Sequence, residues 1–253
     1  MHATERQTAI VAAVRESGLC GVGDLAERLS VSDETIRRDI RRLAARGLVR
    51  KVHGGVALPE PLRESAFRQR MDEHAEAKRA IAEATASLIE NGESVLLDTG
   101  TTTAYVARAL SGHRDLLIAT NCADIARTLA SRNGNRVYIA GGEIRADDGA
   151  VLGHEAIRFV ERFQMHTAIL SIAAVDLDAG LMDYYVDEAE FSSAVIHHAQ
   201  RAVVVADHTK INRQAPVRVA GFEDIDVLVT DRTPPIDYVR RLENAGVNLI
   251  IAG

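Results

Sequence analysis

The stretch Ser32 to Arg46, SDETIRRDIRRLAAR, decides how the chain is organised. Ile36, Ile40 and Leu43 recur at spacings of four and three, so they form one apolar stripe along a predicted helix. Ser32 stands where a helix N-cap is expected, and the two acids that follow it suit the positive end of the helix dipole. The stripe therefore predicts a helix that is buried on one side.

The rest of this predicted helix is cationic. Residues 37–51 carry seven lysines and arginines against one acid, Asp39. Many charge runs of this kind are only solvated surfaces. An exposed cationic helix also suits the phosphates and base edges of double-stranded DNA. The flanking sequence decides between these two interpretations.

The flanks supply the other parts of a winged helix-turn-helix. Apolar spacing predicts a helix over 6–16 and a short helix over 25–29, followed by a tight turn. Residues 48–52 alternate like a strand, and a His-Gly-Gly turn at 53–55 leads to a returning strand at 56–58. In this motif the second helix enters the major groove and the wing contacts the backbone. The candidate DNA-binding residues are Ser32, Thr35, Arg37, Arg38, Arg41, Arg42, Arg50, Lys51 and His53.

Charge divides the chain in the same way. The 253 residues carry a net charge of −6, yet residues 1–58 hold ten Lys/Arg against seven Asp/Glu, a net of +3. The remaining residues hold twenty against twenty-nine, a net of −9. Only the N-terminal part therefore attracts phosphate backbones.

Composition excludes several other classes of protein. The sequence has no apolar run of about 18 residues and no signal-peptide region, so we expect a cytoplasmic protein without a membrane partner. Cys20 and Cys122 lack metal-ligand spacing and are expected to be inert thiols. Neither a cofactor nor a metal is predicted.

A second domain follows a proline-rich boundary at 59–61, and from Ser94 onward it has the pattern of an α/β fold. Short β-branched runs alternate with amphipathic segments, which indicates a mostly parallel, buried sheet. The expected strands are 95–97, 116–119, 137–140, 168–173, 202–206, 227–230 and 247–251, and the expected helices are 77–89, 104–110, 122–131 and 156–163. We predict a DNA-binding domain over 1–58, a linker over 59–76 and an α/β domain over 77–253.

Small polar residues follow several of these strands, where ligands gather in open α/β sheets. The loop 98–103, DTGTTT, leads straight into a helix, and its glycine, amides and hydroxyls suit an oxyanion. An ordinary strand-to-helix turn would look the same. Lys210, after another strand, could neutralise a phosphate or be a plain surface lysine. Asp98, Glu188 and Asp231 could bind sugar hydroxyls or cap helices.

The stretch Ser30 to Gly55 closely resembles the DeoR family of bacterial transcription regulators. The family's Ser and Thr, its Ile-Arg-Arg-Asp and its His-Gly-Gly wing are all met, and the resemblance runs from about Arg6 to Asp231. It implies a sensor domain similar to ribose 5-phosphate isomerase. DeoR-type sensor domains carry an Asp-x-Gly-Thr-Thr loop, a Thr-Asn pair, a Gly-Gly pair, a glutamate before a helix and an Asp-x-Ser/Thr-Lys strand end, and each motif has a counterpart here. The implied effector-binding residues are Asp98, Gly100, Thr101, Thr102, Thr103, Thr120, Asn121, Gly141, Gly142, Glu188 and Lys210.

Within the family, residues 140–153 and 206–210 look most like the branch of glycerol 3-phosphate repressors. Two positions depart from the family pattern. Residues 171–176 read SIAAVD where a Gly-x-x-Gly-x-Asp is usual, which is expected to narrow the pocket, and Ile211 replaces a common aromatic residue. Both departures bear on the identity of the effector and leave the DNA-binding motif unchanged.

We therefore expect a DNA-binding repressor of sugar or glycerol catabolic genes that a phosphorylated sugar or polyol releases from its operator. Glycerol 3-phosphate is the first candidate effector, and a homodimer or homotetramer is the expected assembly. A sugar-phosphate isomerase fused to a DNA-binding module is the alternative, since Glu188 or Asp98 with Lys210 could serve acid–base chemistry. The altered segment 171–176 argues against turnover, and an architectural protein without a ligand would not need these loops.

Overall fold

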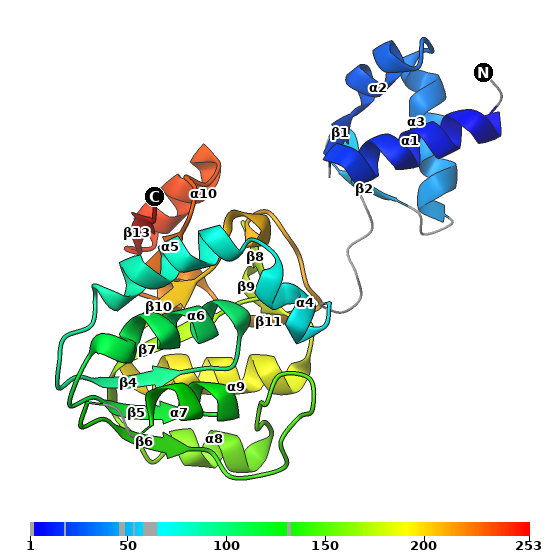
Figure 1. Ribbon diagram of the computed structural model, residues 1–253. Helices are drawn as coiled ribbons and strands as arrows, with labels where there is room; N and C mark the ends of the chain where they lie inside the picture. Colours follow the sequence, from blue (N-terminus) through cyan, green and yellow to red (C-terminus); the bar gives the residue numbers. More distant parts are fainter. Residues whose placement is uncertain (1–2, 18, 46–48, 53, 58–64, 131–132) are drawn as a thin grey trace. The chain divides into compact units, whose positions relative to one another are not determined.

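The computed structural model of the chain describes residues 3–17, 19–45, 49–52, 54–57, 65–130 and 133–253 (Figure 1). The chain divides into two compact units, Met1–Leu62 and Arg63–Gly253, and each is described by itself. No helix within these described ranges is long and apolar enough to cross a membrane.

The described part of the first unit contains helices and a small antiparallel sheet. The helices are α1 (Ala3–Ser17), α2 (Val22–Arg28) and α3 (Asp33–Ala45), and the strands are β1 (Leu19–Gly21), β2 (Arg50–Val52) and β3 (Gly55–Ala57). The strand order is β1-β3-β2. The predicted helices and the two wing strands are present. Strand β1 was not predicted, because three residues are too few to show a period.

The apolar stripe of α3 forms the core of this unit. Ile36, Ile40 and Leu43 are at most 3% exposed, and they cluster with Ile10 of α1 and Leu25 of α2. Burying each such side chain contributes about 1.5–3 kcal/mol. The helical period then directs the arginines of α3 away from this core.

Asp39, the one acid within the cationic stretch, is fully buried. Its carboxylate accepts hydrogen bonds from Arg6 Nε at 2.6 Å and from Gln7 Nε2 at 3.1 Å, both on α1. Burial raises the pKa of Asp39, but the hydrogen bonds from Arg6 and Gln7 outweigh burial and hold that pKa below its ordinary value. Asp39 therefore ties α3 to α1 and does not offset the charge of the exposed face.

The second unit is built on a seven-stranded sheet. Its order is β13-β12-β10-β7-β4-β5-β6, and every neighbouring pair is parallel. The strands are β4 (Ser94–Leu97), β5 (Leu117–Thr120), β6 (Arg136–Ile139), β7 (Met165–Ser171), β10 (Ala199–Val205), β12 (Val227–Thr230) and β13 (Asn248–Ile251). Each of the seven predicted strands overlaps one of these, which confirms the predicted parallel sheet.

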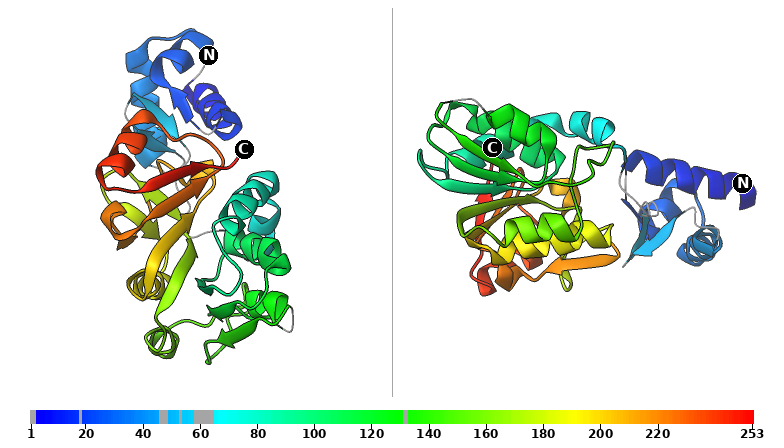
Figure 2. Two further views of the ribbon diagram at one scale, coloured as in Figure 1. Left: turned by 90° about the vertical axis from the view of Figure 1, so that its left-hand side faces the viewer. Right: turned by 90° about the horizontal axis from the view of Figure 1, so that it is seen from below.

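Helices cover both faces of this sheet (Figure 2). On one face lie α5 (Ala75–Ala86), α6 (Thr101–Ala109) and α7 (Ala123–Leu129), and on the other lie α8 (His154–Val160), α9 (Val186–His197) and α10 (Ile236–Asn244). Side chains alternate along β4, so Val95 and Leu97 join the first core and Leu96 joins the second. Both α9 and α10 lie outside the helix ranges expected from the sequence.

A small antiparallel sheet was also not predicted. It consists of β8 (Ala174–Asp176), β9 (Gly180–Asp183) and β11 (Val217–Ala220), in the order β11-β9-β8. The segment SIAAVD spans two sheets, because Ser171 ends β7 while its last three residues form β8. Single-chain periodicity does not reveal such a change of sheet within six residues.

The predicted linker, 59–76, differs from the structure at its C-terminal end. Helix α4 (Phe67–Asp72) and the first residues of α5 belong to the second unit. Phe67 is buried, and Tyr105 Oη of α6 donates a hydrogen bond to the Met71 carbonyl at 3.0 Å. Tertiary contacts therefore stabilise a helix whose own apolar period is weak. The boundary prolines at 59–61 lie outside the described residues.

The strand order places a topological switch point at the centre of the sheet. From β4 the chain moves outward through β5 and β6, and it then returns to β7 on the other side of β4. The loops that follow β4 and β7 therefore diverge and leave a crevice at the carboxyl ends of the strands. Ligands of open α/β sheets bind at such a crevice.

Candidate functional site

The predicted DNA-binding residues of α3 are mostly exposed. Arg37, Arg38, Arg41 and Arg42 are all exposed on this helix. Arg41 lies along the helix, with its Nη2 2.7 Å from Glu34 Oε1, and surface pairs of this kind contribute about 0–1 kcal/mol. The arginine side chains thus remain accessible to a large polyanion.

Ser32 and Thr35 are engaged at the start of α3. The Thr35 N–H donates to Ser32 Oγ at 3.3 Å, which is the predicted N-cap contact, and the two hydroxyl oxygens lie 3.0 Å apart. Ser32 is exposed and Thr35 is half-buried. Their hydroxyls therefore hold the helix end that would enter a groove.

The wing lies beside α3. One hollow of the first unit is lined by Arg37 and Arg41 of α3 together with Lys51 of β2. Lys51 is exposed and Arg50 is half-buried, while the predicted residue His53 lies outside the described residues. The structure thus brings three of the predicted cations around one concave surface.

Glycine is required at each of the two positions of the wing turn for a different reason. Gly54 has a φ of +73°, a left-handed conformation that glycine adopts without strain. A Cβ on Gly55 would lie 2.5 Å from the carbonyl oxygen of Cys20, because β3 pairs closely with β1. These two glycines therefore suit a tight turn that is followed by close pairing of β3 with β1.

A pocket occupies the crevice of the second unit, with about 580 Å³ of empty space including its open mouth. The predicted effector residues that line it are Asp98, Gly100, Thr101, Thr102, Asn121, Glu188 and Lys210. The polar lining residues outside the predicted effector set are Arg70, Thr99, Arg145, Asp148, Ser171, Asp183 and Ser192. They come from α4, from the loops after β4 and β6, from the end of β7, and from β9 and α9.

The loop after β4 is packed against the end of β7. A Cβ on Gly100 would lie 1.8 Å from Ser171 Oγ, so only glycine fits at this position. Gly100 precedes the first turn of α6, where Thr101 and Thr102 are buried in the pocket wall. Amides at a helix N-terminus and threonine hydroxyls are donors suited to an oxyanion. Ser171, which stands where the family pattern usually has glycine, occupies the space beside this loop.

Asp98 is 4% exposed, and its Oδ1 accepts a hydrogen bond from the Ser171 N–H at 3.1 Å. Burial raises the pKa of Asp98 well above its ordinary value, the Ser171 N–H opposes this rise, and the charges of Asp183 and Glu188 add to it. These effects favour the neutral carboxyl. A neutral carboxyl can donate a hydrogen bond as well as accept one.

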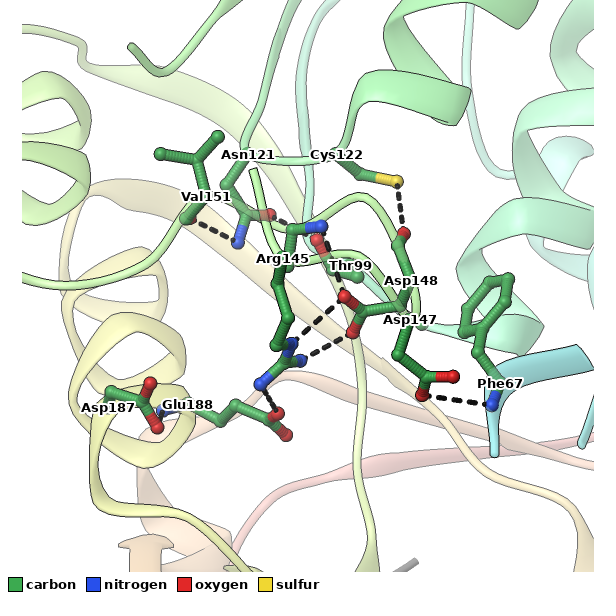
Figure 3. A network of polar contacts seen from close by, with 12 residues as sticks. Phe67, Thr99, Asn121, Cys122, Arg145, Asp147, Asp148, Val151, Asp187 and Glu188 are labelled. Carbon is green, nitrogen blue, oxygen red and sulfur yellow. Dashed lines mark hydrogen bonds and ion pairs between the residues drawn. The ribbon is translucent and has the colours of Figure 1, made fainter. Parts of the chain in front are cut away.

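Arg145 joins two carboxylates across the pocket (Figure 3). It holds Asp148 through two hydrogen bonds, one of them from Nε at 3.0 Å, and its Nη1 lies 2.5 Å from Glu188 Oε1. The hydrogen bond to Asp148 raises the pKa of Arg145, and burial opposes that rise. Burial raises the pKa of Asp148, but Arg145 holds that pKa below its ordinary value. Glu188, predicted as an effector ligand, is thus also a structural partner of Arg145.

Asn121 is fixed in the same network. Its Nδ2 donates to the Val151 carbonyl at 3.1 Å, and its Oδ1 accepts from Thr99 Oγ1 at 3.1 Å. These contacts join the loops after β4, β5 and β6 beneath the pocket (Figure 3). Lys210 is half-buried at the end of a short helical turn after β10, where the Asp207 carboxylate accepts from the Thr209 N–H at 2.9 Å.

Four predicted effector residues do not line the pocket, and they correct the expectation. Thr103 Oγ1 donates to the Gly100 carbonyl at 3.0 Å, and Thr120 Oγ1 accepts from the Cys122 N–H at 3.1 Å. Gly141 and Gly142 are exposed after β6. The threonines are used by local turns, and the glycines lie on an outer loop of the edge strand.

Two further positions also lie outside the pocket lining. Asp231 Oδ2 lies 2.7 Å from His208 Nδ1, and its Oδ1 accepts from the His208 N–H at 2.6 Å, so this carboxylate holds the turn that carries Lys210. Ile211 packs against the core beneath α8–α10. Within the described residues, no group of histidine, cysteine and acidic side chains has the arrangement of a metal site.

Two family models match the chain. The DeoR-like helix-turn-helix domain matches residues 6–61, and the DeoR C terminal sensor domain matches residues 73–232. The chain belongs to the DeoR family. The resemblance carried by the Ser30 to Gly55 stretch and by the sensor loops is thereby confirmed.

Relatives of this DeoR family member include repressors of nearly the same length. The glycerol-3-phosphate regulon repressor of Escherichia coli (strain K12) is 34% identical over 98% of this chain and 99% of its own. The repressor of the same name from Haemophilus influenzae is 37% identical over 95% of this chain and 94% of its own. The HTH-type transcriptional repressor CsqR of Escherichia coli (strain K12) is 34% identical over 97% of this chain and 94% of its own. This DeoR family protein is a DNA-binding transcription regulator, and the alternative of a fused isomerase is not supported.

Solved structures add a distant likeness. Ribose 5-phosphate isomerase A from Methanocaldococcus jannaschii matches 55% of this chain and 55% of its own, at 14% identity and a TM-score of 0.41. At this level of similarity it carries no argument about activity in this DeoR family regulator.

Proposed function

We propose that this regulator represses genes of sugar or glycerol catabolism by binding operator DNA through α3 and the wing. The supporting observation is the row of exposed arginines on α3, opposite a stripe that is buried in the core. An arginine can hold a guanine edge with two hydrogen bonds, and lysines of a wing can bind phosphates. The proposed contacts are Ser32, Thr35, Arg37, Arg38, Arg41, Arg42, Arg50, Lys51 and His53.

The proposed effector is a phosphorylated sugar or polyol that releases the operator. One observation carries this proposal: the pocket at the switch point combines the Gly100–Thr102 loop and Lys210 with carboxyl groups such as Asp98. The loop amides and the lysine suit a phosphate dianion. The carboxyl groups suit the hydroxyls of a sugar or polyol. Glycerol 3-phosphate is the first candidate, because it appears in the names of two of the relatives.

Release requires coupling between the pocket and the DNA-binding unit. We propose a homodimer or homotetramer that places two α3 helices about 34 Å apart, one turn of DNA. Effector binding would favour an arrangement in which this spacing no longer matches the operator half-sites. Coupling of typical size, about 1–3 kcal/mol, weakens DNA binding roughly 5- to 150-fold.

The test combines two measurements on the full chain. Thermal-shift screening against phosphorylated sugars and polyols identifies the ligand, because binding to the folded state raises the midpoint. Fluorescence anisotropy on labelled operator then follows release by that ligand. Glycerol or the free sugar should be inactive at the same concentration, and an equal response to the unphosphorylated compound would remove the phosphate from the proposal.

A further inference from the structure

One pocket residue comes from a part of the chain that the effector motifs do not reach. Arg70 lines the pocket, and it belongs to α4, a helix of the second unit that begins at Phe67. The boundary between the two units lies a few residues earlier in the sequence, between Leu62 and Arg63. The other lining residues all come from position 98 or later. The pocket therefore includes a cation from the segment nearest to the DNA-binding unit in sequence.

Arg70 is held in a defined place. Its Nε donates to the Ser65 carbonyl at 2.9 Å, and its guanidinium lies 5.6 Å from the centre of the Phe67 ring. The Arg70 carbonyl accepts a hydrogen bond from Lys78 Nζ of α5, and Lys78 is only 3% exposed. A buried ammonium bonded to the backbone is costly to displace, so this contact fixes the turn of α4 that carries Arg70.

Two more contacts join α4 to elements that line the pocket. Tyr105 Oη donates to the Met71 carbonyl at 3.0 Å, and Tyr105 lies one turn after Thr101 on α6. At the start of α4, the Phe67 N–H donates to Asp147 Oδ2 at 3.1 Å. Both α6 and the loop after β6 therefore contact the pocket and α4 at the same time.

The loop after β6 connects α4 to the polar contacts of the pocket (Figure 3). Asp147 holds the first residue of α4, and its neighbour Asp148 holds Arg145 inside the pocket through two hydrogen bonds. Arg145 in turn reaches Glu188 of α9. A ligand that displaces or tightens the Arg145 pairs therefore acts one peptide bond away from the residue that anchors α4.

We propose that Arg70 is a ligand of the effector phosphate and that α4, held by Asp147, Tyr105 and Lys78, is the element that reports pocket occupancy toward the DNA-binding unit. This inference rests on the proposed function, since it assumes a phosphorylated effector in this pocket. A guanidinium fits a phosphate with two parallel hydrogen bonds. Because Arg70 is part of α4, binding of the phosphate stabilises the docked helix, and a docked helix in turn strengthens binding of the phosphate.

The first test measures affinity in the full chain. Arg70→Gln is compared with Arg68→Gln, an exposed arginine of the same helix that does not line the pocket. Probes are inorganic phosphate, glycerol 3-phosphate and a panel of phosphorylated sugars, studied by calorimetry. Loss of charge-assisted hydrogen bonds should weaken the phosphorylated probe roughly 10- to 100-fold in Arg70→Gln and leave Arg68→Gln equal to the parent.

The second test separates a ligand from a merely structural residue. Hydrogen exchange of the α4 amides is followed with and without the probe that binds the parent best. The probe should slow exchange over Phe67–Asp72 in the parent and in Arg68→Gln, and the slowing should be lost in Arg70→Gln and in Asp147→Ala. Thermal midpoints without probe show whether each variant is folded.

The outcomes distinguish this inference from the function on which it rests. If the parent binds a phosphorylated probe and Arg70→Gln binds it equally well, Arg70 is not a ligand, although the pocket keeps its proposed role. If the probe binds without any change in α4 exchange, α4 does not report occupancy. If the parent binds no phosphorylated probe, the proposed function fails and this inference fails with it.

Discussion

The arginines of α3 and the central arginine of the sensor pocket are held in opposite ways. On α3 the arginines at 37, 38, 41 and 42 are exposed along one helix. In the sensor pocket Arg145 is only 36% exposed and is bound to Asp148 and Glu188. The first arrangement suits a large polyanion approached from solvent, and the second holds a guanidinium in one orientation beside a small cavity.

The two arrangements give binding specificity in different ways. Exposed cations are screened by salt, so binding by α3 should depend steeply on ionic strength. Partly buried pairs are screened much less, and their cost of desolvation makes their geometry strict. Arginine therefore provides salt-dependent attraction to a polyanion in the first unit and a strict binding geometry in the second. Four predictions test this contrast, ordered by expected size.

The largest effect should follow loss of the one buried acid of α3. Asp39→Ala removes the carboxylate that faces Arg6, whose side chain is 9% exposed. Removing one partner of a buried pair costs about 3–5 kcal/mol. We expect the first unit to unfold at lower urea concentration and operator binding to be lost, while the sensor unit keeps its ligand affinity. Urea titration measures the stability of the first unit, and fluorescence anisotropy with labelled operator measures DNA binding.

The exposed acid Asp33, in the first turn of the same helix, is the matched control. Asp33→Ala should cost less than about 1 kcal/mol. Because the pKa of Asp39 is lowered in the folded state, its contribution is present above its unfolded pKa, about 3.9, and is lost as the pH falls through the folded pKa. An Asp39→Ala protein as stable as the parent would contradict the role of this pair.

The next effect concerns the pocket. Lys210→Ala should weaken a phosphorylated effector roughly 10- to 100-fold, because it removes a charge-assisted contact from the pocket wall. Operator release should then need correspondingly more effector. Calorimetry gives the affinity, and anisotropy gives the release. Arg218→Ala, an exposed cation on β11 of the same unit, should change neither quantity. Equal changes in both variants would show only a general charge effect.

An effect of similar size is expected for base reading. Arg38→Ala should cost about 1–3 kcal/mol for the operator and much less for unrelated DNA. Thr35→Ala should also weaken specific binding, because it removes the hydroxyl that lies 3.0 Å from Ser32 Oγ at the helix start. Gel shifts at several salt concentrations measure both variants. Parent-like binding by both would refute the assignment of α3 as the recognition helix.

The smallest effect should come from the wing. Lys51→Ala removes an exposed cation of β2, and we expect it to weaken all DNA sequences about equally. The slope of log affinity against log salt should fall by about one. The control is again Arg218→Ala, which removes an exposed arginine of the second unit. Arg201 is not used, because its side chain donates hydrogen bonds to Thr167 and Glu93. A loss confined to the operator sequence would instead make Lys51 a base-reading residue.

Much of the fold follows from local patterns. The apolar stripe of α3 and the β-branched runs of the sheet predict elements that the structure contains, because burial of a periodic face is a property of one segment. The predictions are weaker where a segment is stabilised by residues that are distant in the sequence. Helix α4 depends on Asp147 and Tyr105, which lie 80 and 34 residues from their partners in the sequence.

The candidate pocket was predicted in part for a similar reason. Asp98, Gly100 and Asn121 stand at strand ends, and strand ends of a parallel sheet meet at one edge. Thr103 belongs to the same loop motif, yet it lies two residues past Thr101 on a helix. Two helical positions differ by about 200°, so the two side chains point in different directions. The motif alone does not distinguish them.

Spacing within short segments was enough to predict the winged helix-turn-helix, the parallel α/β sheet and the membership of a regulator family. Tertiary packing, in contrast, sets which side chains line the pocket: Arg70, Arg145 and Asp183 do, and Gly141 and Gly142 do not. The strand order brings α4 and the loop after β6 to the same crevice, whereas nothing in their own residues requires it. Local spacing specifies which elements form, and long-range packing specifies which of their side chains meet.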